Sequence, residues 1–306
     1  MSIRVIFRFC WFTWEDKFNV PRGTINRIEL KKDSFSVKDH FKTQEVFQLK
    51  WNEKWNCYET FPKPDLKEVG KYYESENYIS HQKKSKSLKN RVYNWVRNYM
   101  LKTKIDWIKT EVNSGKKLLD VGCGVGAFVE KANEKGFDAV GIEPNEKARN
   151  LAKENHLEVY SKLDELKEKK FDVITLWHVL EHLHQPSKFL KEVNNSLTEN
   201  GKLFIAVPNF KSYDAKHYKE FWAAFDVPRH LYHFSKESIS ILADQNHFEV
   251  IKTYPLKFDS YYVSMLSEKY KTGSSGLKWI WQGLISNYKA KKNGEWSSLV
   301  FVLQKE

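Results

Sequence analysis

The sequence predicts an α/β fold, and three observations indicate it. A short apolar run ends in Asp120 and is followed by a turn with three glycines, after which a helix-like segment begins. Further short apolar runs recur along the chain and alternate with segments of helical character. A second acidic residue, Glu143, directly follows the next of these runs. Together these features predict a sheet whose strand ends bind a ligand.

The glycine turn carries the first functional information. Gly122, Gly124 and Gly126 stand at every second position, and a residue without Cβ lets the backbone approach a ligand closely. The dinucleotide pattern is G-x-G-x-x-G with a pyrophosphate on the helix N-terminus. Here the pattern is D-x-G-x-G-x-G. The acid of Asp120 beside the turn favours a cationic or amine-bearing ligand over a pyrophosphate.

The elements that follow can be read in order. Glu143 ends the second strand about 20 residues after the turn, where a carboxylate can accept both ribose hydroxyls of a nucleoside. The alternative is a surface Glu before a Pro-Asn turn. A helix is expected over 147–154, and the remaining strands are expected over residues 157–160, 171–176, 201–207, 248–251 and 297–303.

These motifs, in this order, resemble the class I S-adenosylmethionine-dependent methyltransferases. The segment Asp226–Ser235, D-V-P-R-H-L-Y-H-F-S, is similar to one found in the bacterial methyltransferase type 23 branch. The resemblance covers residues 116–304. It implies a Rossmann-like, seven-stranded, mostly parallel sheet with helices on both faces and an antiparallel last strand.

The resemblance also implies S-adenosylmethionine as cofactor and S-adenosylhomocysteine as product. The glycine loop would lie against the methionine part, Glu143 would bind the ribose, and the loop after the third strand would wall the adenine. The cofactor-binding residues implied are Asp120, Gly122, Cys123, Gly124, Gly126, Glu143, Pro144, Leu163, Asp164, Trp177 and His178.

The segment after the fourth strand places His178, Glu181 and His182 at i, i+3 and i+4, which share one face if the segment is helical. It matches the H-x-x-E-H pattern of certain zinc peptidases, but no third ligand is evident. It is also similar to the E-x-x-E-H stretch of ubiquinone-type O-methyltransferases, which can hold a divalent metal. His178 replaces the first Glu. Imidazole binds softer metals better than magnesium or calcium, so this replacement argues against a hard-cation site. We therefore expect no metal, with His178 as cofactor neighbour or base; Glu181 and His182 can simply fix the loop.

An aromatic- and His-rich insert follows the fifth strand over 210–237, and we expect it to form a lid on the acceptor side. Arg229, His230 and His233 are candidates for gripping or deprotonating an acceptor, because His exchanges a proton near neutral pH. The alternative is a structural lid whose histidines bond backbone carbonyls. The predicted catalytic residues are thus His178, His230 and His233.

The first third of the chain divides into three parts. Residues 1–37 are unassigned, either disordered or a misassigned start. The resemblance implies a zinc ribbon over residues 38–80, as many members of the family carry one there. Asn52 and Trp55 stand where its cysteines would be, so we expect a metal-free remnant of that ribbon. The resemblance makes Tyr73 and Tyr78 candidates on the acceptor side.

Residues 81–115 are expected to form a helical linker or cap before the catalytic domain, 116–306. Its apolar stripe is expected to pack on that domain while its lysines face solvent; contact of this basic face with a membrane surface or nucleic acid is the alternative. The stripe consists of Leu88, Val92, Trp95, Val96 and Tyr99.

Bulk composition limits the partners. The net charge is +12, from 51 basic and 39 acidic residues, which permits an anionic acceptor such as a nucleotide-linked sugar, an acidic lipid or RNA. No Asn-Pro-Pro-aromatic motif follows the fourth strand, which argues against methylation of nucleic-acid bases. The apolar stretch within 257–292 is too short to span a bilayer and can pack or meet a partner. The three cysteines show no pairing pattern, which fits a reducing cytoplasm.

The sequence therefore predicts a cytoplasmic methyltransferase acting on a small-molecule, sugar-nucleotide or lipid-type acceptor. Two alternatives remain open. A nicotinamide-dependent oxidoreductase would use the same half-fold but has different glycine spacing. A non-catalytic nucleoside-binding protein would keep the pocket without the chemistry.

Overall fold

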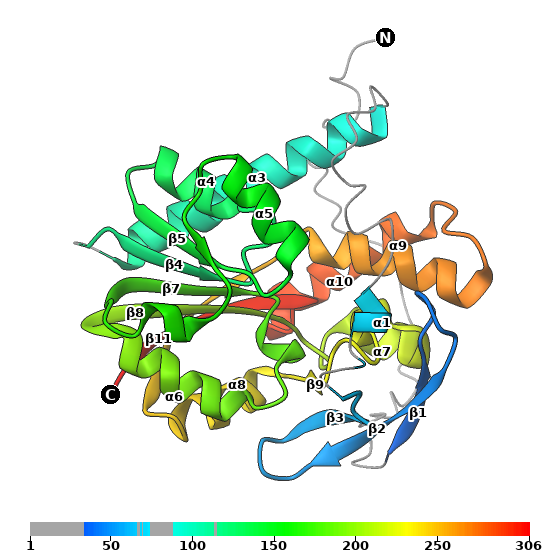
Figure 1. Ribbon diagram of the computed structural model, residues 1–306. Helices are drawn as coiled ribbons and strands as arrows, with labels where there is room; N and C mark the ends of the chain where they lie inside the picture. The colour runs from blue at the N-terminus through cyan, green and yellow to red at the C-terminus, as the bar shows by residue number, and fades with distance from the viewer. Residues whose placement is uncertain (1–33, 66–67, 69, 74–87, 113–114) are drawn as a thin grey trace. The chain divides into compact units, whose positions relative to one another are not determined.

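The computed structural model describes residues 34–306 except 66–67, 69, 74–87 and 113–114 (Figure 1). The predicted segment 1–37 therefore lies almost wholly outside the described residues. The strands are β1 (Phe35–Lys38), β2 (Val46–Asn52), β3 (Cys57–Phe61), β4 (Lys117–Val121), β5 (Asp138–Ile142), β6 (Val159–Tyr160), β7 (Phe171–Trp177), β8 (Leu197–Pro208), β9 (Tyr232–His233), β10 (Phe248–Pro255) and β11 (Ser298–Lys305). The α-helices are α1 (Gly70–Tyr73), α3 (Leu88–Glu111), α4 (Ala127–Glu134), α5 (Glu146–Glu154), α6 (Pro186–Ser196), α7 (Tyr213–Tyr218), α8 (Lys236–Asp244), α9 (Asp259–Thr272) and α10 (Lys278–Asn293). Short 3₁₀ turns are η3 (Leu163–Leu166), η4 (Leu180–His182), η5 (Lys219–Phe221) and η6 (Ala223–Phe225).

Seven strands form the central sheet in the order β10-β11-β8-β7-β4-β5-β6. Strands β4 to β8 pair in parallel, whereas β11 runs antiparallel to both of its neighbours, β8 and β10. The predicted fold class, including the antiparallel last strand, is confirmed. Because β4, β5 and β7 are parallel neighbours, their carboxyl ends meet at one edge, where open α/β sheets bind ligands.

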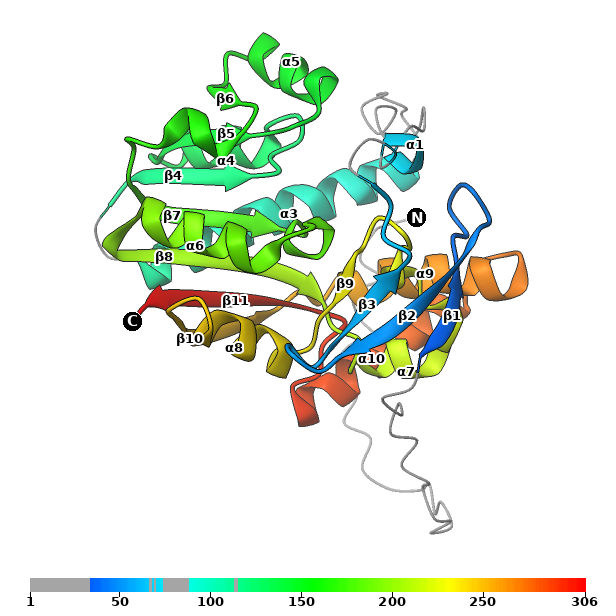
Figure 2. The ribbon, with the colours of Figure 1, turned by 60° about the horizontal axis from the view of Figure 1, so that its bottom comes forward.

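Alternating side chains of the strands build two apolar layers, one on each face of this sheet. Leu118 and Val173 pack on one face with Ile105 of α3 and Phe128 of α4. The next residues along the same strands, Leu119 and Ile174, pack on the other face, with α6 and α8. Figure 2 shows α6 and α8 on the opposite side of the sheet from α3. Both faces are buried, so the strands are nearly continuous apolar runs rather than alternating ones.

A second, four-stranded antiparallel sheet has the order β1-β2-β3-β9. It joins the segment expected to be a ribbon remnant to the insert, since Tyr58 of β3 pairs with His233 of β9. Its β2–β3 turn is fixed by Asn52, whose side-chain oxygen accepts hydrogen bonds from the backbone N–H groups of Lys54 (2.9 Å) and Trp55 (3.3 Å). Strand β1 begins at Phe35, before the boundary placed at residue 37.

Helix α3 differs from its expected packing. Its amino-terminal half exposes Trp95 and Tyr99, which stack on each other with ring centroids 5.7 Å apart, and Tyr99 also meets Phe258 edge-on. The residues that bury against the sheet are instead Ile105 and Ile108, in the carboxyl-terminal half. Trp95 and Tyr99 therefore do not pack on the sheet, whereas the side chains of Leu88 and Val92, like residues 81–87, lie outside the described residues.

The insert is largely internal. Trp222, Phe225 and Phe234 are among its fully or nearly fully buried side chains. The indole N–H of Trp222 donates to Asp214 (2.8 Å), which also accepts from the hydroxyl groups of Ser286 and Ser297 (2.7 Å each). Through these hydrogen bonds, the buried carboxylate of Asp214 links the insert to α10 and to the start of β11.

Candidate cofactor and acceptor site

The glycine turn uses backbone conformations that glycine adopts readily. Gly122, Gly124 and Gly126 all have positive φ (69°, 57° and 83°), a region that other residues rarely occupy. The backbone N–H groups of Gly122 and Cys123 both donate to the carbonyl of Ile142 (2.7 and 3.0 Å), which ties the turn to the end of β5. A Cβ built on Gly124 would meet nothing within 4 Å. The turn thus borders an open space at the sheet edge.

Glu143 links the two strand ends. One carboxylate oxygen accepts from the N–H of Gly124 (2.9 Å) and the other from the N–H of Asn145 (2.8 Å). The side chain is 7% exposed, and each oxygen keeps a second lone pair. Both carboxylate oxygens are therefore held in place by backbone donors, and each can accept one more hydrogen bond.

A lysine that the sequence analysis missed reaches the same edge from α3. Lys104 places its Nζ 4.2 Å from the ring centroid of Trp177, the last residue of β7. Burial lowers the pKa of Lys104, while the charges of Asp120 and Asp259 oppose that effect. Burial also raises the pKa of Asp120, although the Thr175 hydroxyl donates to its carboxylate at 2.6 Å. Lys104 and Asp120 are therefore close enough to interact electrostatically near the carboxyl end of β4.

The other predicted cofactor residues have different environments. The buried indole Nε1 of Trp177 has no hydrogen-bond partner among the described residues. Cys123 is buried, and burial raises the pKa of its thiol, so it is an inert packing group. Leu163 begins η3 and packs against the core, whereas Asp164 is exposed and pairs with Lys167 (3.3 Å). Pro144 is exposed, and its carbonyl accepts from Arg149 (3.0 Å).

His178 lies between two carboxylates. Its Nδ1 is 3.2 Å from Oε1 of Glu181, and its Nε2 is 3.3 Å from Oδ2 of Asp259, the first residue of α9. Burial alone would lower the pKa of His178, but the hydrogen bonds to Asp259 and Glu181 outweigh it and raise the pKa to about 9. The side chain remains 35% exposed, so a bound molecule can reach it.

The segment that follows does not form an α-helix. His178 itself has φ 58°, and only a single 3₁₀ turn, η4, follows. Glu181 meets His178, but His182 turns toward the insert, where its Nδ1 bonds the carbonyl of Arg229 (2.9 Å). The three side chains therefore do not form one helical face.

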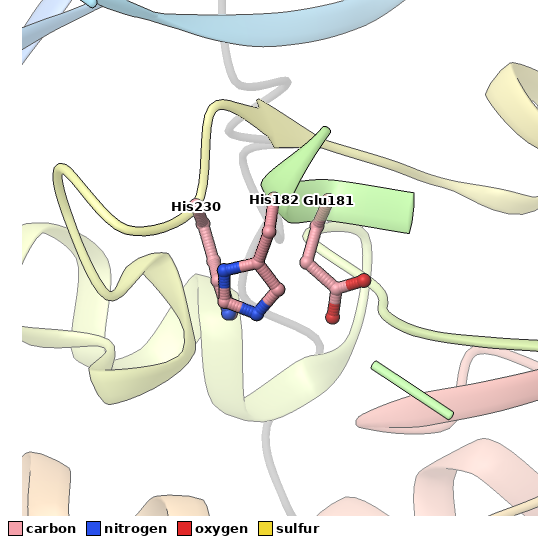
Figure 3. A group of neighbouring side chains, drawn as sticks. All are labelled: Glu181, His182 and His230. Atoms are coloured by element: carbon pink, nitrogen blue, oxygen red, sulfur yellow. The ribbon is translucent and has the colours of Figure 1, made fainter. Parts of the chain in front are cut away.

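The structure instead brings together Glu181, His182 and His230, whose side chains converge from η4 and the insert (Figure 3). One potential ligand atom from each lies within 4.8 Å of the others. Nδ1 of His230 bonds the carbonyl of Ala224 (2.9 Å), and burial lowers the pKa of His182 to about 4. Oε2 of Glu181 is buried without a hydrogen-bond partner among the described residues. The expectation of no metal stays a prediction that this cluster makes worth testing.

Arg229 and His233 lie in the interior. Arg229 is 6% exposed, its guanidinium pairs with Asp226 and also lies 3.6 Å from Asp39, and it donates to the carbonyl of Tyr72 (3.2 Å). Nε2 of His233 bonds the Thr60 hydroxyl (2.9 Å), and burial holds the pKa of His233 well below its ordinary value. These contacts join the insert to the small sheet.

Two predicted acceptor-side residues cannot be placed by their side chains. Tyr73 ends α1, but its side chain lies outside the described residues. Tyr78 lies wholly outside them.

Comparison with known proteins places this architecture in a family. Residues 96–253, just over half of the chain, match the model of a methyltransferase domain family. Curated relatives named ubiquinone biosynthesis O-methyltransferase are 33% identical over 117 residues (Dechloromonas aromatica; 35% of this chain, 50% of the relative) and 40% identical over 107 residues (Pelagibacter ubique; 32% and 45%). The chain thus spans about half the length of the curated relatives it matches.

Solved structures show the same fold at low identity. Magnesium protoporphyrin IX methyltransferase from Synechocystis PCC 6803, with bound SAH, has a TM-score of 0.53 at 14% identity, covering 78% of this chain and 98% of that one. A cyclopropane synthase from Mycobacterium tuberculosis has a TM-score of 0.51 at 15% identity, covering 80% and 100%.

The fold and the family match define a class I methyltransferase. The chain belongs to this methyltransferase domain family. Its residues fit the cofactor, because the space beside Gly124 is open and the carboxylate of Glu143 lies next to it. Within the described residues, no helix combines the length and the apolar character needed to cross a membrane.

Proposed function

We propose that this methyltransferase transfers a methyl group to a hydroxyl group of a small-molecule acceptor. The observation that carries the proposal is His178, an accessible imidazole held between Glu181 and Asp259 at the end of β7. An oxygen acceptor must lose its proton as it is methylated, and a positioned imidazole can take it. The two curated relatives named above are both O-methyltransferases, which supports the same atom type.

The cofactor would be held by groups on three elements. Glu143 would accept the ribose hydroxyls, and the turn around Gly124 would pass along the methionine part. The opposite charges of Lys104 and Asp120 match the carboxylate and ammonium of an amino acid. When bound, S-adenosylmethionine supplies an activated methyl group.

His178 is the best candidate for the base. Its two neighbouring carboxylates orient the ring and stabilise the imidazolium that forms when it takes a proton. With a pKa of about 9, the ring is largely protonated at neutral pH in the free protein. Only the small fraction of molecules with a neutral ring can then accept a proton. His230 and His233 are buried with a ring nitrogen each bonded to protein groups, and these contacts favour a scaffold role.

The acceptor itself belongs to a class rather than to one compound. The excess of basic residues supports a partly anionic molecule, and a sugar nucleotide or a lipid-type acceptor satisfies that condition. The carboxylates around His178 favour an acceptor that offers a hydroxyl donor at the reacting end. We propose that Arg229 acts on the acceptor only indirectly, by fixing the insert.

The proposal is tested by measuring S-adenosylhomocysteine release with panels of hydroxylated, amine and thiol acceptors. We expect turnover with a hydroxylated acceptor and a kcat/KM that rises with pH until about pH 9, because the neutral form of His178 is the base. His178→Asn should lower turnover by about 10²-fold or more and remove that dependence.

His156→Asn is the matched control for this substitution, because His156 is exposed and has nearly the same left-handed φ, 60°. It should leave turnover unchanged. Transfer only to amine or thiol acceptors, or full activity in His178→Asn, would remove the assignment.

A further inference from the structure

Helix α10 presents its large apolar side chains outward. The residues that it buries are small, namely Gly283, Ser286 and Ala290, and they allow close packing on α9. A Cβ on Gly283 would lie 2.6 Å from the Tyr261 ring, and the Ser260 hydroxyl donates to the Gly283 carbonyl (3.4 Å). The exposed apolar residues of α10 and its N-cap are Leu277, Ile280, Trp281, Leu284, Ile285 and Tyr288. We call these six residues the α10 stripe.

The α10 stripe is continuous. Its members are spaced three or four positions apart from 277 to 288, which places them along one side of the helix. Leu277, Trp281 and Tyr288 are 73%, 68% and 60% exposed. Single exposed apolar residues are normal on protein surfaces, but an apolar row over three helical turns marks an interaction surface.

The charge around the stripe selects the partner. Helix α10 contains four lysines and no acidic residue. The acidic residues of α9 do not offset them, because Glu268 is buried beside the Tyr218 hydroxyl (3.2 Å) and Asp259 contacts His178. The last turn of α9 adds Lys269 and Lys271. The surface is therefore apolar along its centre and basic around it.

We propose that the α10 stripe docks on a membrane surface that contains anionic lipids. Helices that lie in the headgroup layer combine Trp and aliphatic residues on one side with flanking lysines, whose long stems let the charge reach the lipid headgroups. A helix of 16 residues, several of them lysines, lies on a bilayer rather than across it.

Two other partners fit less well. A second copy of the chain would oppose lysines to lysines without any acidic residue of α10 between them. Nucleic acid would match the charge, but four of the six stripe residues are aliphatic and offer no ring for base stacking. An anionic bilayer satisfies both the charge and the aliphatic surface.

The docking surface is connected to the candidate site through α9. Helix α9, on which α10 packs, begins with Asp259, the carboxylate that contacts His178. Docking through α10 would thus bring the acceptor side of the enzyme toward the bilayer and favour an amphiphilic acceptor. The docking itself does not depend on O-methylation.

Co-sedimentation of the full chain with vesicles tests the proposal. We expect binding to mixed phosphatidylcholine and phosphatidylglycerol vesicles, weak binding to pure phosphatidylcholine, and loss of binding at high salt. Trp281→Gln with Leu284→Gln should lower the partition coefficient by about 10²-fold, since each loses roughly tenfold of apolar burial. Substituting Lys278, Lys291 and Lys292 by Gln should also cost about 10²-fold, at roughly fivefold each.

Matched control variants distinguish an effect of the α10 stripe from a general loss of exposed apolar or basic side chains. Val46→Gln with Ile251→Gln removes two exposed apolar side chains elsewhere, and Gln at Lys147, Lys188 and Lys191 removes three exposed lysines elsewhere. Both controls should bind vesicles as the unchanged protein does. Equal binding to both vesicle types, or unchanged binding by the stripe variants, would overturn the proposal. A dimer in sedimentation velocity that the stripe variants convert to a monomer would assign the surface to a second copy instead.

Discussion

At the residue scale, the proposed ribose contact of Glu143 can be tested directly. Glu143→Ala should weaken S-adenosylmethionine binding by about 1–3 kcal/mol, because the ribose hydroxyls lose a charged acceptor. The N–H groups of Gly124 and Asn145 lose their partner as well, which adds to the effect. Calorimetric titration measures it. Glu146→Ala, at an exposed position in the first turn of α5, is the control and should bind normally.

Lys104 allows a second measurement of cofactor binding. Lys104→Met should lower affinity for S-adenosylmethionine by about tenfold or more, since the proposed partner of the ammonium is the cofactor carboxylate. It should change the affinity for the decarboxylated cofactor much less. Lys102→Met, at an exposed position on the same helix, should have no effect on either ligand. Equal losses for both ligands would show that Lys104 acts on the pocket as a whole.

His178 makes the folded protein sensitive to pH. Its pKa is about 9 in the folded protein, above its ordinary value of 6.5, so protonation stabilises the fold. The stabilisation is fully present below pH about 6.5 and is lost as pH rises through about 9. The difference in unfolding free energy between the unchanged protein and His178→Asn, measured by urea denaturation across this range, should therefore shrink with rising pH. The contributions of His182 and His233 are the same in both proteins and cancel in this difference. Their lowered pKa values would make stability rise with pH. A difference that stays constant between pH 6 and about 9.5 would show that the carboxylates do not hold the proton.

At the element scale, the turn between β4 and α4 combines two constraints. Gly124 has a left-handed backbone, and nothing lies within 4 Å of the place where its Cβ would stand, which is where we propose that the cofactor binds. Gly136, at the other end of α4, also has a positive φ (89°) and open space around its Cβ position. Substitutions at both glycines strain the backbone, but only a substitution at Gly124 would also meet the proposed ligand.

Gly124→Val should abolish cofactor binding, whereas Gly136→Val should only destabilise the protein by about 1–2 kcal/mol, the cost of a left-handed residue with a Cβ. Thermal denaturation measures the strain in both variants, and calorimetry measures the binding. Normal cofactor affinity in folded Gly124→Val would place the ligand elsewhere.

At the scale of the whole molecule, the contacts between distant segments create the cluster of Glu181, His182 and His230. We expect the purified protein to hold no stoichiometric metal, and chelators to leave cofactor binding and turnover unchanged. Elemental analysis of the protein before and after dialysis against a chelator checks this. One equivalent of zinc that is lost in His230→Gln but retained in His184→Gln would contradict the expectation and assign the cluster as a metal centre.

The whole molecule also shows side-chain contacts that the local sequence pattern did not specify. The spacing of His178, Glu181 and His182 is compatible with one helical face, but the backbone takes a left-handed residue and a 3₁₀ turn there. Spacing predicts a shared face only if the element is helical. Arg229 was a candidate for gripping an acceptor. Only the fold shows its pairing with Asp226 and its proximity to Asp39.

What the sequence determined by itself was the central sheet, the glycine turn and the carboxylate of Glu143. These features are encoded locally, because strand periodicity, a D-x-G-x-G-x-G turn and an acid at the next strand end each occupy a few consecutive residues. The tertiary structure alone decided that Lys104 reaches Trp177 and that Asp259 meets His178. It also decided that α10 faces outward with its apolar side. Such contacts join residues far apart in the chain, and they depend on how whole helices pack on the sheet, which no local pattern specifies.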